Sequence, residues 1–405
     1  MAQEPRKPLN SVKTAGIIIR AVFVGALAAL LVIVQALSFF PIAIVAPLQE
    51  NRNPAPWPDL ELLLQQSGAA KFADQLNRWV DDRAGLRDLF VRLKNQIDYS
   101  VFAVSRNVYI GSNDVLFERE FTEKRFLIDF INEEIYQIAV ETPFSNFADL
   151  LAQRGIKLVV VYNPDKSTIY PEYLPHNIVN LAAAGRMERF RAFLRHQPNI
   201  IFIDGQEILT REKEKTSELL FWRTDLHANY LGSIPIVREL IHRLAIEIAR
   251  PEIAWNEEFQ FHDIPMGGGE GRFLSILNPV IAQGKYAENL YQIGDKEPDG
   301  HWNVVNLPGT GIFNGTFDYE FISDPQECGG KLPATLLFGN SFTDPWWPVG
   351  LHRYFCSIRF SRVTYPTTRL PAVIETMPAG TKFFVLQFVG PHLIHEAPRM
   401  PPDSK

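Results

Sequence analysis

The chain has 405 residues, with 40 basic and 46 acidic side chains and a formal net charge of -6. This balance argues against nucleic acid as a partner, because phosphate binding requires a basic surface. Hydrophobic residues make up 46% of the chain and charged residues 21%, which is typical of a folded globular protein and not of a disordered one.

A membrane anchor is predicted near the N-terminus. Residues 21–40 contain no charged side chain, and a helix of about twenty residues spans roughly the 30 Å of bilayer hydrocarbon. Four basic residues precede this run, which by the positive-inside rule predicts a cytoplasmic N-terminus and an exported remainder: Arg6, Lys7, Lys13 and Arg20. A cleaved signal peptide is the alternative, although its apolar region is usually shorter.

The predicted organisation follows from this anchor. We expect a basic cytoplasmic tail at 1–20, a single-pass transmembrane signal anchor in the inner (cytoplasmic) membrane at 21–45, and a Pro-rich linker at 46–68. The remainder, 69–405, is predicted to be one domain on the periplasmic or extracytoplasmic side. A stretch rich in turn formers at about 251–334 is predicted to be an insertion that shapes or covers a pocket.

Within this domain, helical and strand patterns alternate. Apolar spacing predicts helices over 69–104, over 122–153 with a break at Pro143, and over 181–195, and it predicts a short hairpin over 108–117. Five short apolar runs have the length of buried strands: 157–162, 199–203, 335–338, 355–360 and 382–388. This alternation indicates an α/β domain with a largely parallel, buried sheet.

A serine follows the predicted strand 335–338. Gly339 permits a tight turn, and Ser341 is then presented at the C-terminal end of the strand, where its own N–H can point at a developing oxyanion. The same Gly-Asn-Ser sequence is also an ordinary turn, so this motif alone is weak evidence for catalysis.

The second motif is Asp225-Leu226-His227. Histidine is the usual base for an activated serine, and an acidic neighbour holds its tautomer. In an extended Asp-x-His segment both side chains project from the same side of the backbone. An equally good alternative is that Thr224 or Asp225 caps the following helix, with His227 in its first turn.

Together these segments resemble the alginate O-acetyltransferase family of SGNH-like hydrolases, which are periplasmic proteins that acetylate exopolysaccharides. Four segments carry the likeness in the order of the family: 108–117, 158–171, 223–227 and 338–342. With the predicted elements around them, they span about residues 70–390. The resemblance implies an SGNH hydrolase-like domain with a mostly parallel, flavodoxin-like sheet flanked by helices.

The resemblance also implies roles. Ser341 would take an acyl group as a covalent ester, His227 would act as general base and then general acid, and Asp225 would orient His227. The turn of Gly339 and Asn340 would help the Ser341 amide form an oxyanion hole. Neither a cofactor nor a metal is implied, and the histidines show no metal-ligand spacing.

Four positions depart from the family pattern. Asn340 stands where the family has an acidic residue, and Ala228 replaces the expected tryptophan after the histidine. Val115 stands where the family has Gly-Trp before Leu-Phe, and Gln387 lies where an acid is expected.

The predicted function is an O-acetyltransferase that acylates a secreted or cell-surface polysaccharide, with a membrane-bound O-acyltransferase as its acetyl supplier. An acetylesterase with the same triad is one alternative. A non-catalytic polysaccharide-binding or assembly scaffold is the other, because of Asn340.

Four further residues are weaker candidates for substrate contacts: Lys166, Trp222, Trp346 and Arg353. Exposed lysines and arginines more often solvate a surface, and aromatic residues are as often core as sugar-stacking. The two cysteines, Cys328 and Cys356, lie on either side of the serine and could form one disulfide in an oxidising compartment. The sequence does not supply their separation, so this pairing stays open.

Overall fold

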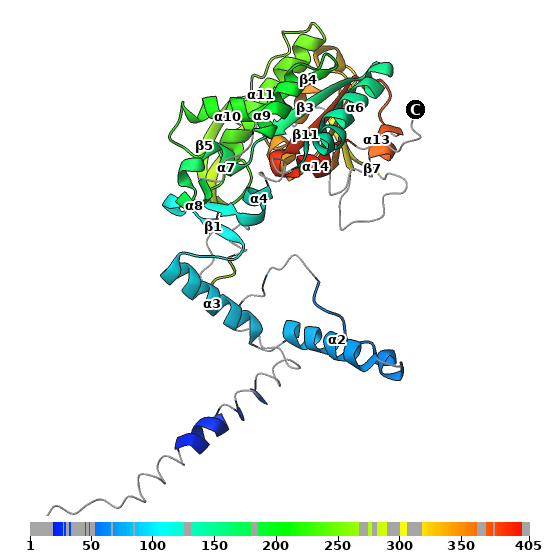
Figure 1. Cartoon of the computed structure of the whole chain (residues 1–405). Coiled ribbons are helices and arrows are strands. Elements are labelled where there is room, and N and C mark those ends of the chain that lie inside the picture. The colour runs from blue at the N-terminus through cyan, green and yellow to red at the C-terminus, as the bar shows by residue number, and fades with distance from the viewer. Residues whose placement is uncertain are drawn as a thin grey trace, which may run out of the picture. The chain divides into compact units, whose positions relative to one another are not determined.

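The computed structural model describes residues 19–26, 28–29, 32–33, 45, 48, 53–65, 68–83, 86–124, 131–179, 185–266, 274–277, 282–289, 300–305, 318–362, 370–375 and 377–398 (Figure 1). The chain divides into two compact units. The first comprises Met1–Ala103 with Arg272–Pro279, and the second comprises Val104–Gly271 with Val280–Lys405.

The first unit contains the helices η1 (Leu60–Leu64), α2 (Gly68–Arg83) and α3 (Arg87–Phe102). The helices α2 and α3 correspond to the helical pattern predicted over 69–104, whereas η1 lies in the segment 46–68 that was predicted to be a linker. Ala103 ends α3 in the left-handed conformation with φ 51°. The predicted anchor at 21–45 lies largely outside the described residues. Among the residues that are described, no helix combines the length and the apolar character needed to cross a bilayer.

The second unit is built on a seven-stranded sheet with the order β4-β3-β11-β9-β10-β8-β7. Its first five strands are mutually parallel, and β8 and β7 extend it as antiparallel strands. The strand bounds in that order are β4 (Ile200–Asp204), β3 (Lys157–Asn163), β11 (Phe383–Val389), β9 (Thr335–Gly339), β10 (Ser357–Arg362), β8 (Asp318–Ser323) and β7 (Gly300–Val305). The predicted α/β class with a mostly parallel sheet is therefore confirmed.

The order of the parallel strands corrects one expectation. A flavodoxin-like sheet has the order 2-1-3-4-5, whereas here the last strand in the chain, β11, lies between the first, β3, and the third, β9. Every residue of β11 is buried, which explains its place in the middle of the sheet. Periodicity identifies such a strand but carries no information on its neighbours.

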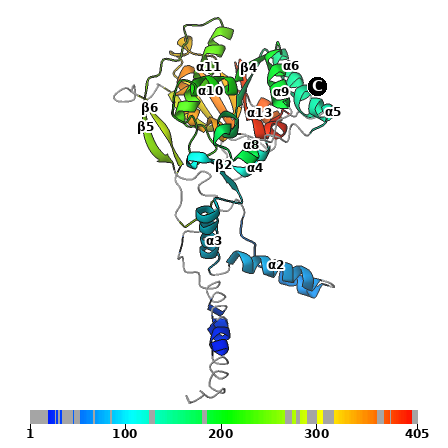
Figure 2. The ribbon, with the colours of Figure 1, turned by 60° about the vertical axis from the view of Figure 1, so that its left-hand side comes forward.

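Helices cover both faces of the sheet, as Figure 2 shows for α10 (Gly205–Lys213) and α11 (Tyr230–Glu247) on one side and α6 (Thr142–Gln153) and α9 (Arg186–Arg195) on the other. Side chains of β3 alternate between two cores. Val159 and Val161 pack in the core that includes α10 and α11, and Leu158 and Val160 pack in the core that includes α6 and α9. Burial on both faces is why the parallel strands read as unbroken apolar runs.

The other elements of this unit are short. Pro143 is the second residue of α6 and follows a π-helical turn directly, and the helical segment 133–153 continues through it, so the predicted break at Pro143 is wrong. The remaining elements are β1 (Val108–Ile110), η2 (Ser112–Asp114), β2 (Leu116–Glu118), α4 (Arg119–Lys124), α5 (Glu133–Tyr136), the π-helical turn η4 (Gln137–Glu141), α7 (Lys166–Ile169), η5 (Pro171–Tyr173), α8 (His176–Val179), η8 (Ser341–Trp346), η9 (Leu351–Tyr354), α13 (Leu370–Glu375), η11 (Gly390–His392) and α14 (Leu393–Glu396).

The segment predicted as an insertion, 251–334, adds four strands. β5 (Phe259–Met266) and β6 (Ala282–Asn289) form a separate antiparallel hairpin, while β7 and β8 join the main sheet. Cys328, in η7 (Cys328–Gly330), forms a disulfide with Cys356 just before β10. The bond ties the end of the insertion to the sheet.

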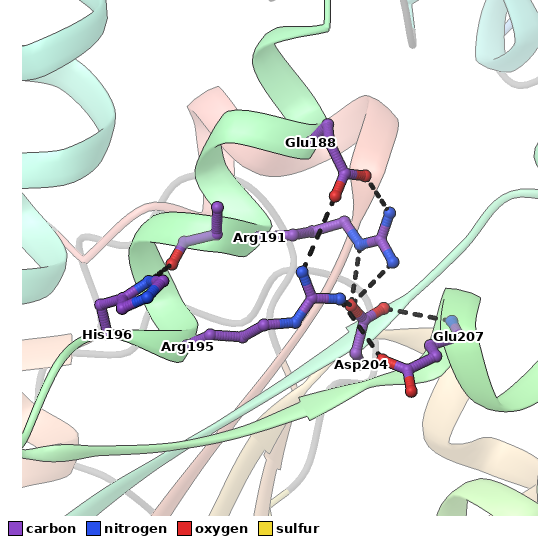
Figure 3. A network of polar contacts seen from close by, with 7 residues as sticks. Glu188, Arg191, Arg195, His196, Asp204 and Glu207 are labelled. Carbon is purple, nitrogen blue, oxygen red and sulfur yellow. Dashed lines mark hydrogen bonds and ion pairs between the residues drawn. The ribbon is translucent and has the colours of Figure 1, made fainter.

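An ion-pair network joins α9 to the end of β4 (Figure 3). Arg191 and Arg195 both bind the Asp204 carboxylate, and the Arg191 contact measures 2.8 Å with both side chains buried. Asp204 also accepts from the Glu207 N–H and so caps α10. The network fixes α9 and α10 on opposite faces of the strand, and a buried carboxylate there is stable because it is paired.

Candidate active site

Ser341 lies at the carboxyl end of β9, as the sequence predicts, and begins η8. The turn requires glycine at 339, since an added Cβ would lie 2.8 Å from Thr343 Cγ2 and 3.0 Å from Gln387 Oε1. Asn340 closes the turn locally. Its side-chain oxygen accepts from the Phe342 N–H at 3.0 Å, and its carbonyl accepts from the Thr343 hydroxyl at 2.7 Å.

Gln387 of β11 supports this turn from the neighbouring strand. Its Oε1 accepts from the Asn340 N–H at 2.9 Å, and its Nε2 donates to Asn163 Oδ1 at 3.4 Å. Gln387 is fully buried. Where an acid was expected, a neutral amide thus provides both an acceptor and a donor without placing a charge in the core. This contact was not predicted, because strand order is needed to see it.

Asp225 and His227 lie in a loop that leads into α11. The loop is closed by a bridge between Phe221 and Ala228. The residue that caps α11 is Asn229, whose side-chain oxygen accepts from the Gly232 N–H at 3.1 Å. The alternative prediction that Thr224 or Asp225 caps this helix is therefore wrong, and Asp225 is left to face His227.

The structure brings the three predicted residues into one hydrogen-bonded chain. His227 Nδ1 lies 2.6 Å from Asp225 Oδ1, and His227 Nε2 lies 2.8 Å from Ser341 Oγ. The same Asp225 oxygen accepts from the His227 backbone N–H at 2.9 Å. Because an ionised carboxylate only accepts, the Nδ1 carries the proton, and the Nε2 of the neutral ring then accepts from the serine hydroxyl.

Burial and charge tune this chain. Burial is the largest single influence on the pKa of the Asp225 carboxyl, and it raises this pKa. The hydrogen bonds from His227 and the charges of His227 and Lys166 together outweigh burial, so the pKa of Asp225 lies below its usual value. Asp225 is 5% exposed at its side chain and His227 is 23% exposed. The acid is thus enclosed and ionised, while the imidazole can be reached from solvent.

Two more carboxyls interact electrostatically with His227 and were not predicted. Burial raises the pKa of Glu118, at the end of β2, and the charge of His227 works against that rise. Burial also raises the pKa of Asp344, in η8, whose carboxylate pairs with Arg362 at 3.1 Å. Since Glu118 and Asp344 lie far apart in the sequence, only the fold reveals that both carboxyls are near the same imidazole.

The weaker candidates do not behave as exposed substrate contacts. Lys166 is 3% exposed, so the expectation of a solvated lysine is wrong. Trp346, the last residue of η8, is fully buried, and Trp222 is covered by β6, where an added Cβ on Gly284 would lie 2.5 Å from the indole. Arg353 pairs with Glu257 at 3.2 Å.

A cavity of about 260 Å³ is lined in part by Arg223, which belongs to the loop that carries Asp225 and His227, but none of the three triad residues is in its lining. It is lined by residues of the β1–β2 turn, of the segment 217–223 and of the β5–β6 hairpin, and its lining includes Tyr173, Arg223 and Lys285. Lys285 pairs with Asp263 at 3.0 Å and with Glu218 at 3.3 Å. The hairpin of the predicted insertion therefore forms part of a polar pocket. Within the described ranges, no group of three or more His, Cys, Asp or Glu side chains is arranged to hold a metal ion.

A comparison with protein families covers the Asp-x-His motif but not the serine motif at 338–342. Residues 113–265 match the family model described as the SGNH hydrolase-like domain of the acetyltransferase AlgX. This match includes the Asp-x-His segment and confirms the predicted resemblance to SGNH-like acetyltransferases. No curated protein sequence matches the chain.

Several solved structures are similar to the chain at low identity. The O-acetyltransferase domain of Pseudomonas putida AlgJ is 17% identical, with 74% of this chain and 95% of that chain covered and a TM-score of 0.44. Bacillus cereus PatB1 is 11% identical, with 70% and 96% covered and a TM-score of 0.45. Pseudomonas aeruginosa AlgX is 16% identical, with 71% and 66% covered and a TM-score of 0.41.

Proposed function

We propose that this protein is an O-acetyltransferase that acylates a secreted or cell-surface polysaccharide through a serine acyl-enzyme. The single observation that carries the proposal is the hydrogen-bonded chain from Asp225 through His227 to Ser341 at the carboxyl edge of the sheet. Ligands of open α/β sheets bind at this edge. The match of residues 113–265 to an acetyltransferase family model supports the acetyl group as the cargo.

The proposed reaction has two half-reactions. His227 Nε2 removes the Ser341 hydroxyl proton as Oγ attacks the acetyl carbonyl, and the imidazolium then protonates the leaving group, so that an acetyl ester on Ser341 remains. In the second half, His227 takes the proton of an acceptor hydroxyl, and the resulting alkoxide attacks the ester. Breakdown of this second tetrahedral intermediate returns the proton to Ser341.

The turn that carries Ser341 supports an oxyanion site. The first amides of a helix have no partner within the helix. In η8, the Phe342 N–H is bonded to the Asn340 side chain and the Thr343 N–H to the Asn340 carbonyl. The Ser341 N–H is the amide of this turn that we assign to the developing oxyanion, where one such donor contributes roughly 3 kcal/mol to transition-state stabilisation.

Acceptor binding is proposed for the cavity beside the triad loop. The pocket has room for a group the size of a single sugar ring, and its lining combines an aromatic ring, Tyr173, with charged side chains that suit hydroxyl groups. If water took the place of the sugar hydroxyl in the second half-reaction, the same residues would make an acetylesterase. A non-catalytic scaffold is less well supported, since Asn340 closes the serine turn by accepting from Phe342.

We further propose that residues 21–45 anchor the chain in the cytoplasmic membrane, with the second unit outside the cytoplasm. The Cys328–Cys356 disulfide supports this placement, because such bonds persist in oxidising compartments. A cytoplasmic acetyl donor would then have to be delivered across the membrane, and a membrane-bound O-acyltransferase is the partner proposed for that step.

The test uses the purified full-length chain, a chromogenic acetyl ester, and oligosaccharides as acceptors. We expect an acetyl group on Ser341 by mass spectrometry in the wild type and none in Ser341→Ala. Acetylated oligosaccharide forming faster than free acetate would select the transferase over the esterase. Equal turnover by wild type and Ser341→Ala, with no acetylated serine, would refute both enzymatic functions.

A further inference from the structure

Lys166 lies buried at the carboxyl end of β3, as the first residue of α7. Its Nζ donates to three main-chain carbonyls, those of Trp222 at 3.1 Å, Arg223 at 3.2 Å and Asp225 at 2.8 Å. An ammonium group has three N–H bonds, so the three acceptors match it in number. Lysine is rarely buried unless its charge is compensated, and here the three carbonyl oxygens compensate the charge of Lys166.

The three carbonyls belong to the loop that carries the Asp-x-His motif. They converge on one point, and their negative ends would repel one another without a cation between them. Arg223 of this loop has other partners as well: its N–H donates to the Gln283 carbonyl at 2.7 Å, and its carbonyl accepts from the Leu116 N–H at 3.0 Å. These bonds hold the loop at Arg223, whereas the Lys166 Nζ reaches the carbonyl of Asp225 itself from the end of β3.

The Lys166 charge is also shielded from solvent, since the residue is 3% exposed. Its Nζ is 5.3 Å from the centre of the Phe117 ring. The nearby carboxylate that it influences is that of Asp225. A cation that holds the backbone and faces the buried acid acts on both the geometry and the ionisation of the same residue.

We propose that Lys166 is a positioning residue for the Asp225–His227 pair, and that it holds the loop 222–225 so that the carboxylate meets His227 Nδ1 while Nε2 reaches Ser341. The inference rests on the proposed function and replaces the predicted role of Lys166 as a substrate contact. A catalytic constellation tolerates displacements of only about 0.5 Å. Without the Lys166 ammonium that binds the three carbonyls, we expect the loop 222–225 to shift by more than this distance.

Lys166→Met tests the proposal, because methionine keeps the length of the side chain and removes its charge and donors. Lys213→Met is the matched control. Lys213 also donates to a carbonyl, that of Ile169 at 2.6 Å, and its Nζ lies 4.6 Å from the Tyr170 ring, but it does not contact the triad loop.

For Lys166→Met we expect kcat for acetyl-ester hydrolysis to fall by about 100-fold with KM within about twofold of wild type. The low-field proton resonance of His227 Nδ1–H, which wild type and Ser341→Ala should share, is expected to be lost or shifted. Lys213→Met should keep both kcat and the resonance. A purely structural role for Lys166 would alter thermal stability and leave the resonance in place.

The outcomes separate the two proposals. If wild type forms the acetyl-enzyme and folded Lys166→Met retains its kcat and its resonance, the positioning role is refuted and the acyl-transfer function stands. If wild type forms no acetyl-enzyme, the proposed function fails, and the positioning role fails with it. If Lys166→Met does not fold, Lys166→Gln takes its place, because the glutamine amide keeps two N–H donors. A kcat about tenfold below that of wild type would then support the proposal, and an unchanged kcat would overturn it.

Discussion

Replacing Gln387 by leucine removes the amide that ties β11 to the serine turn while keeping a side chain of similar size. The Asn340 N–H, which now donates at 2.9 Å, would lose its acceptor in a residue that is 7% exposed. A buried donor without a partner costs about 1–3 kcal/mol. The 3.4 Å contact with Asn163 is long and adds little. We expect the free energy of unfolding to fall by about 2 kcal/mol.

The effect on catalysis should be larger than this stability loss suggests. Ser341 directly follows Asn340, and a shift of about 1 Å in a reacting group can lower a rate by about 100-fold. Stopped-flow measurement of the acylation burst with a chromogenic acetyl ester gives the rate, and urea unfolding monitored by fluorescence gives the stability. Gln387→Glu, which keeps an oxygen to accept from Asn340, should retain more of the acylation rate than Gln387→Leu.

Thr335→Val provides the control. Thr335 lies at the opposite end of β9, and its hydroxyl donates to the Pro333 carbonyl at 3.0 Å. The control should lose about 1 kcal/mol of stability and keep the wild-type acylation rate. The explanation is wrong if folded Gln387→Leu acylates as fast as wild type, or if Gln387→Glu is as slow as Gln387→Leu.

Three other changes have defined expectations. Asp225→Asn should lower kcat by about 10⁴-fold in ester hydrolysis, because the amide favours the wrong tautomer of His227. The pKa of Asp225 is held below its ordinary value of 3.8, so the ionised Asp225 stabilises the folded state at neutral pH. This stabilisation is lost as the pH falls through the lower pKa of the folded state. Acid unfolding curves of Asp225→Asn should therefore lack this decrease in stability. Lys285→Ala should raise KM for an oligosaccharide acceptor by about tenfold and leave ester hydrolysis unchanged, as steady-state kinetics with both substrates would show. Replacing Cys328 and Cys356 by serine opens a loop closed over a separation of 28 residues and should lower the unfolding free energy by about 3.5 kcal/mol in urea titrations, with the acylation rate retained at low temperature.

Much of the fold was predictable, because buried parallel strands are continuous apolar runs. Each of the five predicted runs falls on a strand within about two residues, including 157–162 on β3 and 382–388 on β11. The antiparallel strands β7 and β8 were not predicted, since they lie in a polar, turn-rich stretch whose pairing depends on the rest of the sheet.

The candidate site was likewise predictable only in part. Asp225, His227 and Ser341 were predicted because their residue types and local spacing carry chemical meaning without knowledge of the fold. The surroundings were not, because they depend on contacts between distant segments. Lys166 lies 59 positions from Asp225 and Gln387 lies 47 from Asn340. No local sequence pattern distinguishes a buried lysine that donates to three loop carbonyls from a lysine on the surface.

The place of β11 in the sheet has a consequence for how the protein is made. Its register joins Phe383 to both Lys157 and Thr335, so the two halves of the sheet are bridged only by the last strand to be synthesised. A chain emerging from a ribosome or a translocation channel therefore cannot complete its central layer until nearly all of it has appeared, and pairings over such long sequence separations form slowly. The central layer of the sheet would therefore stay incomplete for most of the synthesis of the chain.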